Sequence, residues 1–272
     1  MTVFFSIVIP TYNSGASIEA CLASIAGQTY KNLEVIVIDN NSNDQTHEVV
    51  KAAQETLSIK WYSEPDKGIY DAMNKGIEQA SGNYIYFLGS DDSLYAPSVL
   101  QLVHDAVSTS AADIIYGNVM MRGNNQWVAN GTVHAGEFDL KRLISHNICH
   151  QSIFYNQSVF KKIGNYNLKY PVFADHDLNL RCAANYKLHY LDHIIANFNV
   201  GGASTQLTDA AFEKDRNANI ISYFFSKLHT RAFVDLRLYV RQAAFSRNTN
   251  LQWLTRAYCA AIYFKLKMQS FF

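Results

Sequence analysis

Polar segments follow four apolar runs in the first hundred residues, and three of these segments carry carboxylates. The segments are PTYN at 10–13, DNNSND at 39–44, EPDKG at 64–68 and GSDD at 89–92. Clustered carboxylates repel one another unless a cation or hydrogen-bond donors satisfy them. If the four segments meet, they indicate a site for a hydroxyl-rich ligand, a divalent metal ion, or both.

The elements that would position these segments alternate between strands and helices. Apolar runs predict strands, and helical periodicity or cap spacing predicts the helices between them. The strands are expected at 5–10, 33–38, 59–62, 83–88 and 113–119, and the helices at 17–26, from 42, at 69–80 and at 97–108. Alternation of this kind implies a parallel sheet covered by helices on both faces. Ligands bind beyond the carboxyl ends of such strands, where the four polar segments would converge.

The pattern changes after residue 120. Strand-like pieces at 127–133, 152–155, 187–191 and 194–200 mix with short helices, and from about 205 the chain is helical. Two apolar stripes mark the tail, one at 220, 221, 224, 225 and 228 and one at 253, 254, 257, 258, 261 and 262. We therefore expect an α/β domain over 1–204 and a helical extension over 205–272.

Composition narrows the class of protein. The 272 residues are 49% apolar and carry 23 basic and 23 acidic side chains, which excludes a disordered chain and argues against a nucleic-acid partner. The balance hides an asymmetry, because residues 1–204 carry a net charge of −6 and residues 205–272 one of +6. Four scattered cysteines predict reduced thiols and a cytoplasmic protein. Neither a signal peptide nor an apolar run of about 18 residues is visible, so no membrane span is expected.

Four pieces of the sequence, taken in order, resemble the glycosyltransferase family 2 enzymes, and in particular bacterial enzymes that build capsule, exopolysaccharide or O-antigen repeats. They are SIVIPTYN, VIVIDNNSNDQT, SEPDKGIYDAMNKGIEQASGNYIYFLGSDD and FADHDLNLR, within roughly residues 5–204. The resemblance implies the GT-A fold, in which a Rossmann-like, mostly parallel central sheet is flanked by helices. It also implies a nucleotide-binding half at 1–119 and an acceptor-binding half at 120–204.

The resemblance implies a nucleotide site at the ends of the first strands. Its residues would be Pro10, Thr11, Tyr12, Asp39, Asp71 and Asp91. Asp39 would accept the ring N–H of uracil or thymine, which favours a UDP-sugar. Tyr12 suits either the core or a base, and Asp44 is interpreted as a structural residue in the first turn of a helix. Met73 stands where relatives often have an arginine. Lys75 suits either contact with a phosphate or a solvated helix charge, and the second interpretation is favoured.

The GSDD segment resembles the metal-binding element of the family. Asp91 or Asp92 would hold Mn²⁺ or Mg²⁺ against the donor diphosphate, and both remain candidates. Gly89 replaces the usual first aspartate. The resemblance also makes Asp175 the general base and Asp177 a structural partner of Arg181, four residues on.

His150 and Gln151 are candidates for acceptor binding. His146 and His150 have the spacing of a helical metal pair, but no third ligand follows.

The sequence is thus expected to encode an inverting, metal-dependent hexosyl- or N-acetylhexosaminyltransferase. It would move one sugar from a nucleotide-diphosphate sugar to a hydroxyl of a saccharide or lipid-linked saccharide in surface polysaccharide synthesis. The alternative is a degenerate transferase that only binds a nucleotide or a partner. A sugar-nucleotide pyrophosphorylase would need a Gly-rich phosphate loop, which is absent here. The basic tail suits peripheral contact with the cytoplasmic face of a membrane, or packing in a bundle or a homo-oligomer.

Overall fold

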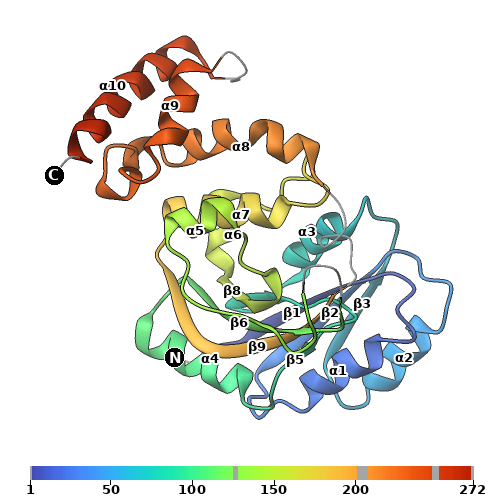
Figure 1. Ribbon diagram of the computed structural model, residues 1–272. Coiled ribbons are helices and arrows are strands. Elements are labelled where there is room, and N and C mark those ends of the chain that lie inside the picture. Colours follow the sequence, from blue (N-terminus) through green and yellow to red (C-terminus); the bar gives the residue numbers. More distant parts are fainter. Residues whose placement is uncertain (1, 125–127, 201–207, 247–250, 271–272) are drawn as a thin grey trace.

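The computed structural model describes residues 2–124, 128–200, 208–246 and 251–270 (Figure 1). Within these residues one nine-stranded sheet has the order β3-β2-β1-β4-β8-β6-β9-β5, and β7 pairs with β6. The strands are β1 (Phe5–Thr11), β2 (Leu33–Asp39), β3 (Ile59–Ser63), β4 (Tyr84–Phe87), β5 (Ser93–Leu94), β6 (Ile114–Arg122), β7 (Val133–His134), β8 (Ile153–Asn156) and β9 (Leu188–Asn199). The α/β class predicted from the sequence is therefore confirmed.

The first half of the sheet is parallel, as predicted. β1 pairs in parallel with β2 and β4, and β2 pairs in parallel with β3. The register sets Thr11 opposite Asp39, and Asp39 opposite Ser63. The last residues of three strands thus lie side by side at one edge.

The second half of the sheet is mixed. β8 enters between β4 and β6 and runs antiparallel to both, so the fifth predicted strand does not neighbour the fourth. The strands predicted at 187–191 and 194–200 form one strand, β9, which is parallel to β6 with register shifts around Gly117. An added Cβ at Gly117 would lie 2.6 Å from the His193 carbonyl, so glycine permits this close approach. Of the strand expected at 127–133, only Val133 belongs to a described strand, and residue 127 lies outside the described part.

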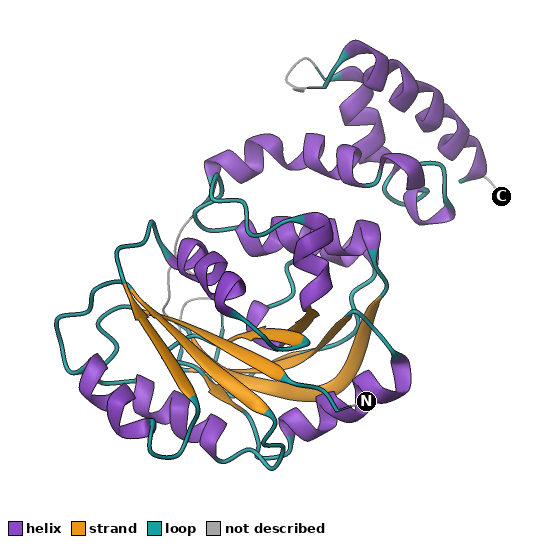
Figure 2. Cartoon of the chain, turned by 180° about the vertical axis from the view of Figure 1, so that it is seen from behind, coloured by secondary structure: helices purple, strands orange, loops and turns teal. Residues whose placement is uncertain are grey.

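Helices cover both faces of the sheet (Figures 1 and 2). One face packs on α1 (Ile18–Ala26), α2 (Thr46–Ala53) and α4 (Val99–Ser110), and the other on α3 (Ile69–Gln79), α5 (Leu140–Ser145), α6 (Gln157–Ile163) and α7 (Ala174–Asn185). Strand alternation explains the two cores: Val8 of β1 faces the α3 side, and its neighbours Ile7 and Ile9 face the α1 side.

The capping box predicted at residue 42 is absent. Helix α2 begins at Thr46 instead, and Ser42 donates its hydroxyl hydrogen to Asp39. Asp44 lies just before the helix, where its carboxylate accepts hydrogen bonds from the amides of Thr46 and Gly15. Asp44 therefore fixes the loop, in keeping with its structural interpretation.

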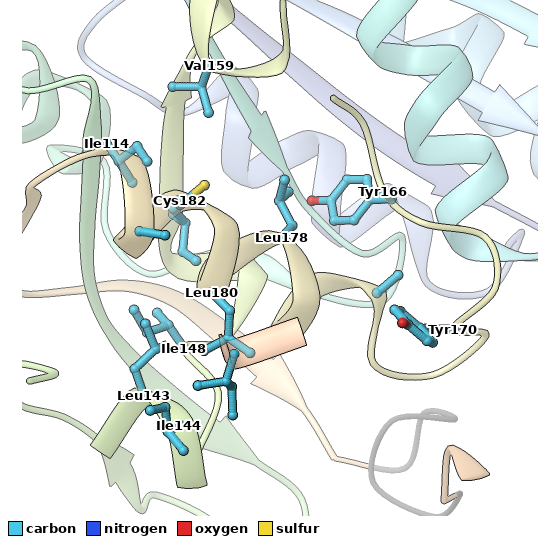
Figure 3. Packing of buried hydrophobic residues seen from close by; sticks show 14 of the residues in the cluster. Ile114, Leu143, Ile144, Ile148, Val159, Tyr166, Tyr170, Leu178, Leu180 and Cys182 are labelled. Atoms are coloured by element: carbon cyan, nitrogen blue, oxygen red, sulfur yellow. The ribbon is translucent and has the colours of Figure 1, made fainter. Parts of the chain in front are cut away.

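Helix α7 is buried along most of its length. Figure 3 shows Leu178, Leu180 and Cys182 of α7 among side chains from neighbouring elements, including Leu143 and Ile144 of α5. Three consecutive polar residues of its first turn are also buried, namely Asp175, His176 and Asp177. The dense packing fixes the start of the helix, and with it the Asp175 side chain.

The tail continues the core on the α7 side. It forms α8 (Ala210–Tyr223), short 3₁₀ turns at Phe225–Lys227 and Arg231–Phe233, α9 (Arg237–Phe245) and α10 (Trp253–Gln269). Four residues of the first predicted stripe are buried, namely Ile220, Ile221, Phe224 and Leu228, while Phe225 is exposed. None of the helices described, in the tail or elsewhere, is long and apolar enough to cross a membrane.

Candidate active site

A first group of polar residues, here called the strand-end cluster, comprises Thr11, Asp39, Ser63, Asp66 and Asp71. Asp39 is 1% exposed, and its Oδ2 accepts hydrogen bonds from the Ser63 hydroxyl (2.7 Å) and the Ser42 amide (2.9 Å). The protein thus supplies the donors that keep a buried carboxylate at a strand end.

Asp66 and Asp71 complete this cluster. The Asp66 carboxylate accepts from the Gly68 amide at 2.8 Å, and the Asp71 carboxylate accepts from the Lys67 amide at 3.0 Å. Burial raises the pKa of Asp66, and the nearby charges of Asp71 and Asp39 act in the same direction. Three carboxylates therefore face a common region, as the sequence predicted for two of them. Asp66 was not assigned a role from the sequence, although it lies in the segment that follows the third strand.

The surroundings of Tyr12 and Lys75, which lie near the cluster in sequence, bear on their two alternative interpretations. Tyr12 is 62% exposed and does not belong to the core, whereas Pro10 is buried within β1. Lys75 forms an ion pair with Glu64 (2.9 Å) and donates to the Pro65 carbonyl oxygen, so its ammonium group is not a free solvated charge.

The loop after β4 brings two carboxylates together above Gly89. An added Cβ at Gly89 would lie 2.6 Å from Asp92 Oδ2 and 3.0 Å from Asp91 Oδ1. Asp92 is 2% exposed and accepts from the Asn199 amide (2.8 Å) and from Gln151 Nε2 (2.9 Å). Burial, followed by repulsion from Asp91, raises the pKa of Asp92 to about 6. Asp91 is exposed, and the described residues give its carboxylate no hydrogen bond.

This loop is joined to the end of β1. The hydroxyl groups of Ser14 and Ser90 share a hydrogen bond of 2.7 Å. The loop after the first strand and the loop after the fourth are thus in direct contact, and the predicted convergence of polar segments is present.

Two adjacent residues connect Asp92 to Asp175. They are His150 and Gln151, in the 3₁₀ turn His150–Ser152. Gln151 donates to Asp92, and His150 Nδ1 lies 3.4 Å from Asp175 Oδ2. The other Asp175 oxygen, Oδ1, accepts from the His176 amide at 2.8 Å. Asp175 lies in the first turn of α7, and the N-cap position of that helix belongs to Phe173.

A pocket of about 500 Å³ opens beside this row and is here called the α7 pocket. Asp175, His150 and Gln151 line one part of it. Its other walls include apolar side chains from several elements, namely Met121, Val128, Val133, Val172, Phe173 and Phe198. Helix α8 of the tail adds Glu213 and Arg216. His150 Nε2 is buried and has no partner among the described residues, so it is a free polar atom at the pocket wall.

Burial favours the neutral form of three ionisable groups around the pocket, namely Cys149, His134 and His176. Burial, and then the charges of Asp175 and Asp92, raise the pKa of the Cys149 thiol to about 12. Burial likewise lowers the pKa of His134 and of His176, and the His176 ring lies 2.6 Å from the Leu143 carbonyl oxygen. A Cys149 thiolate is thus excluded as a nucleophile at neutral pH.

Two expectations at this site have clear outcomes. His146 is exposed at the end of α5, whereas His150 is buried in the 3₁₀ turn, so the two do not share a helix and form no helical metal pair. Asp177 Oδ2 accepts from Arg181 Nε at 2.9 Å, which is the predicted ion pair.

The Asp91 and Asp92 carboxylates have the donor chemistry of a Mg²⁺ or Mn²⁺ site. No cluster of three or more His, Cys, Asp or Glu side chains suited to a metal ion occurs in the described part of the chain. Mg²⁺ is often held by one or two carboxylates, with substrate phosphates and water completing its shell. The two oxygens that converge above Gly89 fit that pattern.

Solved structures with this fold are glycosyltransferases of the GT-A class. TarS residues 1–349 from S. aureus, in complex with UDP-GlcNAc, align with a TM-score of 0.63 and 18% identity, covering 98% of this chain and 73% of that one. The Pyrobaculum calidifontis mannosyltransferase PcManGT, with GDP-Man and Mn²⁺, aligns with a TM-score of 0.59 and 16% identity over 99% and 88% of the two chains. The chain spans 43% of a longer TarS structure. The molecule therefore has a GT-A fold.

Sequence comparison then gives the family. The profile of Glycosyl transferase family 2 matches residues 6–164. A Mycobacterium tuberculosis PGL/p-HBAD biosynthesis glycosyltransferase is 41% identical over 218 residues, which are 77% of this chain and 82% of the relative. The Streptococcus pneumoniae glycosyltransferase GlyG is 32% identical over 120 residues, 43% and 40% of the two chains. The chain belongs to glycosyltransferase family 2 and is a glycosyltransferase.

Proposed function

We propose that the protein transfers one sugar, with inversion, from a nucleotide-diphosphate sugar to a hydroxyl of a saccharide or lipid-linked saccharide. The observation that carries this proposal is the continuous row from Asp92 through Gln151 and His150 to Asp175. The row joins the carboxylates of the β4 loop to a pocket wall that holds a buried carboxylate and a free imidazole nitrogen.

Asp175 is the proposed general base. An acceptor in the α7 pocket would place its hydroxyl against Asp175 Oδ2, whose contact with His150 Nδ1 is 3.4 Å long, because Oδ1 accepts the shorter hydrogen bond from the His176 amide at 2.8 Å. The acceptor oxygen attacks the anomeric carbon, its proton passes to Asp175, and the bond from that carbon to the diphosphate oxygen breaks. Attack opposite the leaving group inverts the anomeric centre. His150 Nε2 is available to hydrogen-bond a further acceptor group.

The strand-end cluster is the proposed nucleotide site, with Asp39 for the base, a UDP-sugar as donor, and Tyr12 available to stack on the base. Asp91 is the better metal ligand of the acidic pair, because it is exposed and Asp92 is committed to Gln151 and Asn199. A bound Mn²⁺ or Mg²⁺ would supply charge neutralisation for the departing diphosphate. PcManGT, a structural neighbour, was solved with GDP-Man and Mn²⁺.

The walls of the α7 pocket support an acceptor with an apolar part. Six apolar side chains line it, and its carboxylate and guanidinium groups come from Asp175 of α7 and from Glu213 and Arg216 of α8. A lipid-linked saccharide would place its sugar hydroxyl at Asp175 and less polar atoms against these walls. We place this reaction in surface polysaccharide synthesis. The M. tuberculosis relative, which is named for PGL/p-HBAD biosynthesis, is likewise a biosynthetic glycosyltransferase.

The test is calorimetric titration with UDP, GDP, TDP and CDP, each with and without Mn²⁺. We expect one nucleotide, UDP, to bind at least tenfold more tightly when Mn²⁺ is present. Asp91→Asn should abolish the Mn²⁺ effect, and Asp105→Asn on α4 is the matched control that should leave it unchanged. Folded protein that binds none of the four nucleotides would contradict the donor site and support the non-catalytic alternative.

The division at residue 204 stays part of this proposal, because residues 201–207 lie outside the described part of the chain. We place a nucleotide-binding half at 1–119, an acceptor-binding half at 120–204 and an extension at 205–272. Helix α8 of the extension lines the α7 pocket, so the extension would take part in acceptor binding. A cytoplasmic location follows from the four unpaired cysteines and remains a prediction.

A further inference from the structure

Helix α10 has two apolar faces, and only one of them is buried. Cys259, Ile262 and Leu266 lie in the core shared with α9. The sequence stripe that begins at Trp253 points elsewhere, because Trp253 is 74% exposed and Leu254 is 59% exposed. The single stripe expected from the sequence is therefore split between the core and the surface.

The exposed face is continuous along the helix. Residues 253, 257, 261, 264 and 268 are all exposed and recur every three or four positions, which is the spacing of one helix face. Phe264 is 58% exposed, Met268 is 67% exposed, and the ring of Phe245 from α9 lies 6.4 Å from that of Phe264. We call this surface the α10 face, and its large apolar residues are Phe245, Trp253, Leu254, Phe264 and Met268.

Two lysines flank the α10 face. Lys265 and Lys267 are exposed, and helical periodicity sets them on opposite sides of the apolar stripe. From Leu236 to the end, the sequence has six basic residues and no acidic one. Figure 1 places α9 and α10 beyond α8, on the side away from the sheet. An apolar stripe with a Trp and a Phe between lysines is the arrangement of helices that lie in a membrane interface.

We propose that the α10 face docks on an anionic lipid bilayer. Two copies of this chain pair poorly through this face, because the lysines of the two faces would meet without an acidic partner. Anionic headgroups complement the lysines, and the acyl boundary accepts the apolar stripe. This inference does not depend on the donor, the metal ion or the catalytic residue.

The test is co-sedimentation of the full chain with vesicles of phosphatidylcholine alone and with 30% phosphatidylglycerol. We expect binding to the anionic vesicles, weakened at high salt, and at least tenfold less binding to the neutral ones. The variant Trp253→Ser/Phe264→Ser/Met268→Ser should lose at least tenfold in partitioning. Leu168→Ser, which removes an exposed leucine on the catalytic domain, is the matched control and should bind normally.

A second variant guards against loss of folding in the triple variant. Lys265→Glu/Lys267→Glu keeps the apolar stripe and should also lose at least tenfold in binding to anionic vesicles. Sedimentation velocity without lipid supplies the competing outcome. The proposal would be overturned if the natural chain is a dimer and does not bind vesicles, while the triple variant is a monomer. That result would assign the face to a second copy. Equal binding by the natural chain and both variants would also overturn it.

Discussion

At the ends of β1, β2 and β3, the protein supplies its own donors to the carboxylates of the strand-end cluster. Asp39 accepts from Ser42 and Ser63, and Asp66 from a main-chain amide. In the α7 pocket, by contrast, His150 Nε2 has no partner within the described residues, and six of the lining side chains are apolar. A site whose polar groups are already satisfied is rigid before its ligand arrives, whereas a free buried nitrogen is costly until a ligand satisfies it. The strand-end cluster therefore suits the proposed donor site, and the α7 pocket suits the proposed acceptor site.

The largest expected effect is at Asp175. Asp175→Asn removes the proton acceptor but keeps the hydrogen bond from the His176 amide. We expect kcat to fall by about 10²–10⁴-fold. Initial rates of nucleoside diphosphate release would measure this, and calorimetric donor affinity should stay within a factor of two. A fall of less than tenfold would move the base to another residue, with His150 the next to substitute.

The second effect concerns stability at the opposite end of the same strands. Burial alone would raise the pKa of Glu34, but hydrogen bonds from Lys60, Ser6 and Ser81 outweigh it and lower that pKa from 4.5 to about 2. Glu34→Gln should therefore cost at most about 3 kcal/mol at pH 7, since the Lys60 ammonium is half in water.

The pH dependence of this loss follows from the sign of the shift. A lowered pKa stabilises the folded state above pH 4.5, and the contribution disappears as pH falls toward 2. Urea unfolding of natural protein and Glu34→Gln should thus differ at pH 7 and converge on acidification. Glu55→Gln, at an exposed site, is the control. A constant difference from pH 7 to pH 3 would show that lost packing, not charge, is responsible.

The third effect concerns the strand-end cluster, whose carboxylates already have hydrogen-bond donors from the protein. Asp39→Asn replaces one carboxylate oxygen by an amide group. The hydrogen bonds lost are those from the Ser42 amide and the Ser63 hydroxyl if Oδ2 is replaced, or the one from the Ser42 hydroxyl if Oδ1 is replaced. We expect nucleotide affinity to fall about tenfold, by analogy with other hydrogen bonds to charged groups. Ser63→Ala, which removes one donor, should act in the same direction and less strongly. If both variants bind the nucleotide as tightly as the natural chain, the nucleobase binds elsewhere.

The smallest effect is at the apolar wall of the α7 pocket. Val133 is 39% exposed, so Val133→Ser should not disturb the fold. We expect the acceptor KM to rise about threefold to tenfold for an octyl glycoside, because about 1 kcal/mol of apolar contact is lost. The methyl glycoside of the same sugar should show no change, and neither should Leu168→Ser. Equal effects on both glycosides would argue against an apolar subsite.

The fold was predictable where local pattern decides it. Alternating runs up to residue 119 locate β1 to β4 and their helices, because strands and helices alternate along that part of the chain. The position of β8 between β4 and β6 depends on pairing across about seventy residues, which no local pattern encodes. The capping box at Ser42 was wrong because Asp39 takes the serine hydroxyl hydrogen instead.

For the candidate site, the sequence indicates single residues but not how they are connected. The motifs single out Asp39, Asp71, Asp91, Asp92 and Asp175 as candidates, but they do not show that Gln151 and His150 connect Asp92 to Asp175. The pocket walls could not be predicted, because Met121, Val133 and Phe198 come from three different strands. Likewise, the periodicity of α10 shows apolar residues without showing which of its two faces is covered.

Gly89 constrains how this sequence can change over time. An added Cβ would meet Asp92 Oδ2 at 2.6 Å, and Asp92 is itself held by Gln151 and Asn199. An aspartate introduced at position 89 would therefore have to displace a buried carboxylate that two other residues hold. The effect of a substitution at position 89 thus depends on the residues at 92, 151 and 199, so these four positions are expected to vary together rather than one at a time.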